Sequence, residues 1–236
     1  TRQLASRAEA GALLATDGIF SMDGDLAPLR ELARLCEQEG ATLMVDDAHG
    51  LGVLGDNGAG TLSMLDLGQR DVPVLMATLG KALGCHGAFV AGSANLVEGL
   101  LQSARTYVYT TAMPPAVAAA ALAAVRIARE ESWRREKLAA LIRRFRDGAQ
   151  QLGLPLMPSD TAIQPLLLGE ATTAMAAAGA LEAVGFLVGA IRPPTVPAGK
   201  ARLRITLSAA HEEEHVDQLL EALSGLAPDE AGSPPL

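Results

Sequence analysis

The sequence is poor in aromatic residues and in cysteine, and it has no long apolar run. Phe, Trp and Tyr make up 3% of its 236 residues and hydrophobic residues 49%, so the core must be built mainly from Ala, Leu, Val and Ile. The two cysteines, Cys36 and Cys85, have neither a disulfide pattern nor a metal-ligand spacing, and we expect reduced thiols in a cytoplasmic protein. No apolar run reaches the roughly 18 residues of a membrane-spanning helix, and we expect neither a secretory signal nor a membrane partner.

The charge balance is acidic. With 19 Lys and Arg against 27 Asp and Glu, the formal net charge is −8 at pH 7. Such a surface does not attract a phosphate backbone or an anionic lipid, which argues against a nucleic-acid partner. A local basic pocket for a single anionic ligand is compatible with this charge.

The first half alternates short apolar runs with a helical pattern. The helical spacing of leucines in DLAPLRELARLCEQEG predicts a helix over 25–40, which Gly40 would end. Runs of strand length are ALLATD (12–17), ATLMVDD (41–47), VPVLMAT (72–78) and GAFVAGS (87–93). This pattern predicts an α/β fold with a large, mostly parallel sheet buried on both faces, in which ligands bind at the carboxyl ends of the strands.

The second half begins with a long helical stretch after Pro114 and Pro115, with a break expected near 130–132. Beyond it, a smaller α+β domain is predicted from strands over 162–169 and 201–208 and helices over 171–185 and 211–225. We therefore expect the later part of a large domain in 1–112, connecting helices in 113–150, a small domain in 151–228 and a frayed tail in 229–236. The opening TRQLASRAEAGALLATD reads as the inside of a helix, and we expect the chain to be the later part of a longer polypeptide.

Two candidate sites follow predicted strands. In VDDAHG (45–50), one of Asp46 and Asp47 would face a cationic ring nitrogen and His49 would bond to the same ligand. The alternative is a solvated turn in which an Asp is a cap. In ATLGKALG (77–84), Lys81 between two glycines would be a nucleophilic amine in a partly desolvated site, with the Thr78 hydroxyl near a phosphate. The alternative is an ordinary surface lysine.

Two further segments carry charged side chains. TDGIFSMDGD (16–25) is typical of a loop, and its acidic spacing misses the Ca²⁺-binding EF-hand pattern, so we expect no metal. In IRPPTVPAGKARLRITLS (191–208), alternation puts Arg202 and Arg204 on one face of a strand, where an arginine could grip a carboxylate with two parallel bonds. The alternative is a pair of solvent-facing arginines on an edge strand.

The order of these motifs, with TTAMPP (110–115) between them, resembles the α-oxoamine synthases. These are pyridoxal-phosphate (PLP) enzymes with the PLP-dependent transferase fold of the aspartate-aminotransferase type. The resemblance covers nearly the whole chain. In the family, an upstream half supplies a ring-stacking aromatic residue and a phosphate loop. We expect that half to precede these residues, and the alternative is a chain that is not a competent enzyme by itself.

The resemblance implies a role for individual residues. Lys81 matches the lysine that binds the PLP aldehyde, Asp46 the acid that faces the pyridine nitrogen, and His49 the histidine at the phenolic oxygen. Ser21 and Thr78 match a serine and a threonine of the cofactor site. The family's substrate contacts match Thr195 in the proline loop and Arg204, which would grip the amino-acid carboxylate.

Within the family, IRPPTVPAG and SDTAIQPLLLG (159–169) resemble the members of biotin biosynthesis. This implies condensation of L-alanine with pimeloyl-CoA or a pimeloyl carrier protein to give 8-amino-7-oxononanoate, by a homodimer. Three alternatives stay open. They are a glycine C-acetyltransferase or other α-oxoamine synthase, a non-catalytic partner subunit of the same fold, and a small-molecule binder without PLP.

Overall fold

The structure, a computed structural model, describes residues 11–226 and divides into two compact units. Within that range, the first unit holds 11–20 and 26–132, and the second holds 21–25 and 133–226. The division at Ser132 falls inside the range 113–150 that we expected to connect two domains. The expected tail, 229–236, and the opening residues 1–10 lie outside the described residues.

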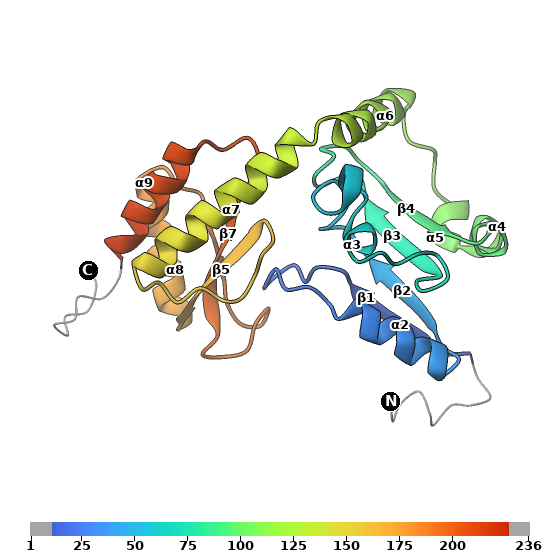
Figure 1. The fold of residues 1–236 in the computed structure, drawn as a ribbon, viewed down its shortest axis with the longest axis horizontal. Coiled ribbons are helices and arrows are strands. Elements are labelled where there is room, and N and C mark those ends of the chain that lie inside the picture. Colours follow the sequence, from blue (N-terminus) through green and yellow to red (C-terminus); the bar gives the residue numbers. More distant parts are fainter. Residues whose placement is uncertain (1–10, 227–236) are drawn as a thin grey trace. The chain divides into compact units, whose positions relative to one another are not determined.

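The first unit is built on a four-stranded sheet with the order β1-β2-β3-β4 (Figure 1). Its strands are β1 (Leu13–Asp17), β2 (Thr42–Asp46), β3 (Val74–Thr78) and β4 (Ala88–Gly92). β1, β2 and β3 are parallel, as predicted, whereas β4 runs antiparallel to β3. Most side chains of β4 are exposed in the described part of the chain, so the expected burial on both faces is wrong for this strand.

Helix α2 (Leu29–Gln38) supplies the core that covers this sheet. It begins at Leu29, four residues later than predicted, because Pro28 precedes it and the bridge between Ile19 and Leu26 keeps the chain extended. Its apolar face buries Leu29, Ala33 and Cys36 against β2. The remaining helices of the unit are η1 (Asp56–Gly58), α3 (Thr61–Met64), α4 (Ala94–Ser103), α5 (Arg105–Val108) and α6 (Pro115–Glu130).

The second unit is an antiparallel sheet of the order β5-β7-β6 covered by helices. Its elements are α7 (Trp133–Gln151), β5 (Ile163–Gly169), α8 (Ala171–Ala183), β6 (Gly189–Ile191), β7 (Ala201–Thr206) and α9 (Glu213–Ser224). The break between α6 and α7 falls where it was predicted, whereas β6 was not predicted from its short GAI segment. Because β7 is the central strand, the edge-strand alternative for Arg202 and Arg204 is wrong.

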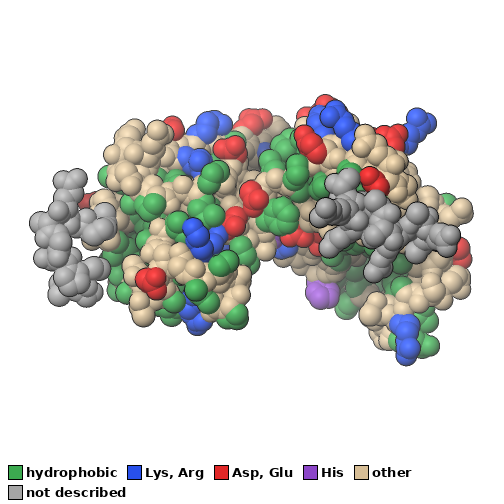
Figure 2. Space-filling view, turned by 90° about the horizontal axis from the view of Figure 1, so that it is seen from below, with side chains coloured by type: hydrophobic (Ala, Val, Ile, Leu, Met, Phe, Trp, Pro, Cys, Tyr) green, Lys and Arg blue, Asp and Glu red, His purple; other side chains and the backbone are tan. Residues whose placement is uncertain are grey.

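The surface mixes both signs of charge. Figure 2 shows acidic and basic side chains interspersed on the visible face, with hydrophobic side chains between them. Between residues 11 and 226, no helix combines the length and the apolar character needed to cross a membrane.

Candidate active site

The carboxyl ends of three parallel strands bring acidic and basic side chains of the first unit together. Asp17 ends β1 and is in register with Asp46, which ends β2. Thr78 ends β3, and Lys81 follows it in the next loop. Since carboxyl ends of parallel strands meet at one edge, this is the edge at which ligands bind in such sheets.

The pKa of Asp17 reflects the charges of both neighbouring residues. Burial raises the pKa of Asp17, the negative charge of Asp46 raises it further, and the positive charge of Lys81 lowers it. Asp17 therefore interacts with both of the residues that the motifs singled out. The sequence placed Asp17 at a strand end but assigned it no role.

Asp46 and Asp47 lie in different environments although they are adjacent. Asp47 is 1% exposed, and its carboxylate accepts hydrogen bonds of 2.7 Å from both the backbone N–H and the hydroxyl of Thr61. A Cβ added at Gly18 would lie 2.8 Å from an Asp47 carboxylate oxygen, and Cβ atoms at Gly50 and Gly60 would overlap this carboxylate. Asp47 is therefore enclosed by protein and cannot contact a ligand.

Asp46 remains available for a ligand. Its side chain is half-buried, and its Oδ1 accepts one hydrogen bond of 2.9 Å from the N–H of Ala48. Within residues 11–226 its Oδ2 accepts no hydrogen bond. His49 is half-buried in the turn that follows. Asp46 thus has a carboxylate oxygen that a ligand could contact, and its role opposite a cationic ring stays a prediction.

The loop that carries Lys81 is closed by hydrogen bonds. The Leu79 N–H bonds to Gly87 O at 2.9 Å, and the Cys85 N–H bonds to Leu79 O at 2.8 Å. The Thr78 hydroxyl donates to Gly87 O and accepts from the Gly80 N–H, both at 3.1 Å. Thr78 thus shapes the loop. The side chain of Lys81 is exposed, so the expected partly desolvated amine is not found in the described part of the chain.

The other candidate residues belong to the second unit. Arg204 is half-buried, and its Nε donates to the carbonyl oxygen of Ser21 at 2.6 Å. Arg202 is 3% exposed and forms an ion pair with Asp23. Arg202 is therefore occupied, and Arg204 is the arginine of the two that has capacity for a ligand. Thr195 is exposed in the turn after β6.

Two acids of the loop 16–25 have contacts within the protein, because Asp17 lies at the sheet edge beside Asp46 and Asp23 pairs with Arg202.

Within residues 11–226, no group of three or more His, Cys, Asp and Glu side chains is placed to hold a metal ion. The sequence did not predict that Thr61 binds Asp47 or that Asp23 pairs with Arg202. Their contacts cross 14 and 179 positions of the chain, so no local sequence signal marks them.

Comparison with known proteins places the chain in a family. The model of the family "Aminotransferase class I and II" matches residues 1–223. The chain belongs to this family. The predicted PLP-dependent transferase fold of the aspartate-aminotransferase type is thereby confirmed.

Individual relatives are similar over almost all of the chain. An 8-amino-7-oxononanoate synthase of Alkalilimnicola ehrlichii is 61% identical over 94% of this chain and 57% of the relative. A Sphingomonas wittichii serine palmitoyltransferase has a TM-score of 0.90 and 33% identity over 95% of this chain and 57% of its own. A serine palmitoyltransferase variant from S. paucimobilis, solved with a bound PLP–myriocin aldimine, has a TM-score of 0.88 and 28% identity over 95% and 58%. The chain spans about half the length of the curated relatives it matches.

Replacement of Asp47 by Asn should change how stability depends on pH. Burial raises the pKa of Asp47, so the folded state binds this proton more tightly than the unfolded chain does. The resulting stabilisation is complete below the unfolded-state pKa, about 4, and is lost as the pH rises through the folded-state pKa. Asn does not ionise and can still pair with both Thr61 groups. The free energy of unfolding of Asp47→Asn should therefore fall less than that of the wild type as the pH rises toward neutrality.

The measurement is urea unfolding of both proteins between about pH 4.5 and about pH 7.5. Asp66→Asn, which removes an exposed carboxylate of the same unit, is the matched control and should parallel the wild type. Parallel curves for wild type and Asp47→Asn would show that the buried carboxyl does not control this slope.

Proposed function

We propose that the protein, at its full natural length, is an 8-amino-7-oxononanoate synthase that uses PLP. In this reaction L-alanine and a pimeloyl thioester give 8-amino-7-oxononanoate, CO₂ and the free thiol carrier. The observation that carries the proposal is the open carboxylate of Asp46 at the same sheet edge as Lys81, while the adjacent Asp47 is enclosed. The 61% identity to a curated synthase supports this member of the family.

The described residues fit PLP. Lys81 offers an exposed amine for the aldehyde, and Asp46 offers an unbonded oxygen for the pyridine nitrogen. Bound PLP would supply an electron sink for the bonds at the substrate Cα. The carboxylate of Asp46 would hold a proton on the ring nitrogen, because a negative charge beside it favours the protonated ring.

The remaining residues would orient the reactants. His49, in the turn after Asp46, would donate to the phenolic oxygen, and Ser21 would contact the cofactor. The Thr78 hydroxyl already donates to Gly87 O, so it must give up that bond to donate to a phosphate. Once released, the Lys81 amine would accept the proton from the substrate Cα. Arg204 would bind the amino-acid carboxylate, with Thr195 as a further substrate contact.

We further propose a cytoplasmic homodimer, with the acyl group carried on CoA or on a carrier protein. The free thiols of Cys36 and Cys85 agree with a reducing compartment. The alternative of a non-catalytic partner subunit is disfavoured by Lys81, because such subunits lack the lysine.

The substrate assay tests the assignment. We expect the protein at full natural length to release the thiol carrier with L-alanine plus pimeloyl-CoA or pimeloyl carrier protein, at a kcat/KM at least about 100-fold above that with glycine plus acetyl-CoA. A preference for the glycine pair would instead assign a glycine C-acetyltransferase.

Borohydride reduction should attach the cofactor to Lys81. The protein is incubated with PLP, reduced and analysed by peptide mass spectrometry. The other lysines of the chain, Lys137 and Lys200, serve as internal controls. We expect the phosphopyridoxyl mass on the Lys81 peptide, unchanged labelling in Lys200→Ala and no labelling in Lys81→Ala. Attachment at Lys137 or Lys200 would contradict the proposed site.

Asp46→Asn should lower kcat/KM by about 100-fold or more, since it removes the charge that holds the ring proton. The matched control Asp66→Asn, an exposed acid of the same unit, should remain close to the wild type. Retention of PLP, followed by its absorbance after gel filtration, is measured in parallel. Activity of Asp46→Asn within a few-fold of wild type would favour a binder that does not use this acid.

A further inference from the structure

The short segment Ser21–Asp25 is anchored to the second unit, although its neighbours on both sides belong to the first. The anchors are of three kinds. Hydroxyl groups bond to the carbonyl of Gly24, an ion pair holds Asp23, and the carbonyl of Ser21 accepts a bond from Arg204. No role for this segment was evident from the sequence apart from that of Ser21.

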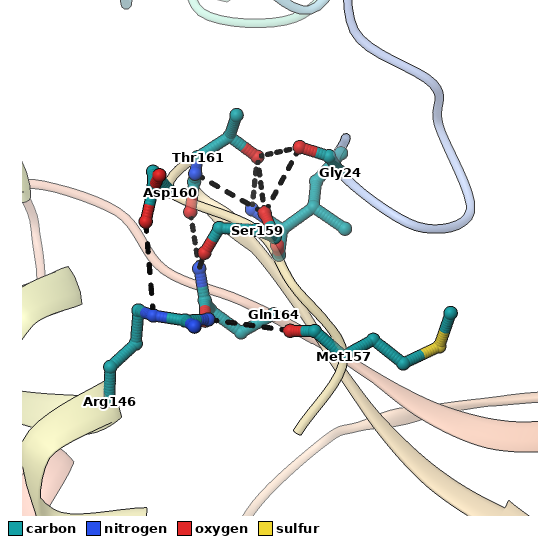
Figure 3. A network of polar contacts seen from close by, with 8 residues as sticks. Gly24, Arg146, Met157, Ser159, Asp160, Thr161 and Gln164 are labelled. Carbon is teal, nitrogen blue, oxygen red and sulfur yellow. Dashed lines mark hydrogen bonds and ion pairs between the residues drawn. The ribbon is translucent and has the colours of Figure 1, made fainter. Parts of the chain in front are cut away.

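The anchor at Gly24 is a buried polar network. The Thr161 hydroxyl donates to the Gly24 carbonyl oxygen at 3.1 Å. The Ser159 hydroxyl lies 3.0 Å from the same oxygen, but its nearer acceptor is the carbonyl oxygen of Ile163, at 2.7 Å (Figure 3). The side-chain amide of Gln164 donates to the carbonyls of Ser159 and Thr161 at 3.0 and 2.7 Å, and Gln164 accepts from Arg146 at 2.9 Å. Each member is thus held by the next, which makes the position of the Gly24 carbonyl well defined.

Gly24 itself cannot carry a side chain in this network. Its φ is +69°, and an added Cβ would lie 2.5 Å from both Ile163 O and the Ser159 hydroxyl. The backbone of the segment therefore approaches the start of β5 as closely as glycine allows.

The second anchor is the ion pair of Asp23 with Arg202. The Arg202 guanidinium is almost completely buried, and its Nε donates to Lys200 O at 3.0 Å. A buried guanidinium without its carboxylate would be costly, so Asp23 is held where it is. This fixes the residue two positions after Ser21.

The third contact connects the segment to the candidate substrate arginine. Arg204 donates from Nε to Ser21 O at 2.6 Å and from Nη1 to the Thr206 hydroxyl at 3.0 Å. Two bonds from different nitrogens fix the plane of a guanidinium. Within residues 11–226, Nη2 of Arg204 makes no hydrogen bond, so it is the group that remains for a ligand.

We propose that Asp23 is a positioning residue for recognition of the substrate α-carboxylate. Together with the Gly24 anchor, the Asp23–Arg202 pair holds the Ser21 carbonyl where it binds Nε of Arg204, so that the guanidinium presents its remaining N–H groups in one orientation. Asp23 touches neither substrate nor cofactor in this role. The inference rests on the proposed function, in which Arg204 binds the amino acid.

A purely structural ion pair predicts a different result. Loss of such a pair would lower stability and weaken all ligands alike. Loss of a positioning residue weakens ligands with a carboxylate and spares those without one. L-Alanine and L-alaninamide differ only in this group, so the pair of ligands separates the two roles.

The experiment measures the Kd of L-alanine, glycine and L-alaninamide by calorimetry on the PLP-loaded protein at full natural length. In Asp23→Asn we expect the Kd of both amino acids to rise about 10-fold, because a charge-assisted bond is misaligned, while the Kd of L-alaninamide stays unchanged. Asp217→Asn is the matched control. It removes the carboxylate that pairs with Arg144 in the same unit, and it should leave all three constants unchanged.

Thr161→Val is a milder second variant, which weakens the Gly24 anchor and leaves the Asp23 pair intact. We expect a smaller rise in the same direction, again confined to the amino acids. Equal weakening of amino acids and amide, or no difference between Asp23→Asn and the control, would overturn the positioning role alone. Failure of the wild type to bind either amino acid would overturn the proposed function, and this inference with it.

Discussion

The enclosed carboxylate of Asp47 is the constraint on which the candidate site depends. Its two oxygens accept hydrogen bonds from Thr61, and Gly18, Gly50 and Gly60 pack so closely around it that an added Cβ at any of them would crowd the carboxylate. Its backbone N–H also bonds to Met76 O in the neighbouring strand. Asp47 is fixed inward just after β2. Of the two carboxylates, that of Asp46 is therefore the one with an oxygen that makes no hydrogen bond within residues 11–226.

The two arginines of β7 likewise differ in their contacts. Both lie on one face of the strand, but Arg202 is buried and neutralised by Asp23, whereas Arg204 bonds to a backbone carbonyl that carries no net charge. Among residues 11–226, Arg204 therefore keeps a charge that no acid in its immediate contacts compensates. In each pair, one side chain, Asp47 or Arg202, is buried against a protein partner, and the other, Asp46 or Arg204, is left able to contact a ligand.

Several features could be predicted from the sequence for clear physical reasons. The parallel strands follow short apolar runs, and α9 follows apolar periodicity. The break between α6 and α7 follows the charged EES segment after an Ala-rich helix. The order of the motifs was enough to predict the PLP-dependent transferase fold that the match to the family "Aminotransferase class I and II" then confirmed. The start of α2 was predicted too early because Leu26 pairs with Ile19 and stays extended. Strand β6 was missed because its pairing with β7, not its composition, makes it a strand.

The sequence by itself determined the fold class and the residue types of the site, because periodicity and motif order are local properties that survive without coordinates. The residues alone left both members of each pair open and the resemblance named Asp46 and Arg204, but only the tertiary structure shows what occupies the other two, Asp47 and Arg202. Whether Asp46 or Asp47 is enclosed depends on Thr61, and whether Arg202 or Arg204 is paired depends on Asp23. Thr61 and Asp23 reach these side chains only when the chain packs into its tertiary structure. The same packing removes the Asp47 carboxylate and the Arg202 guanidinium from solvent, which is favourable only because each then has a partner.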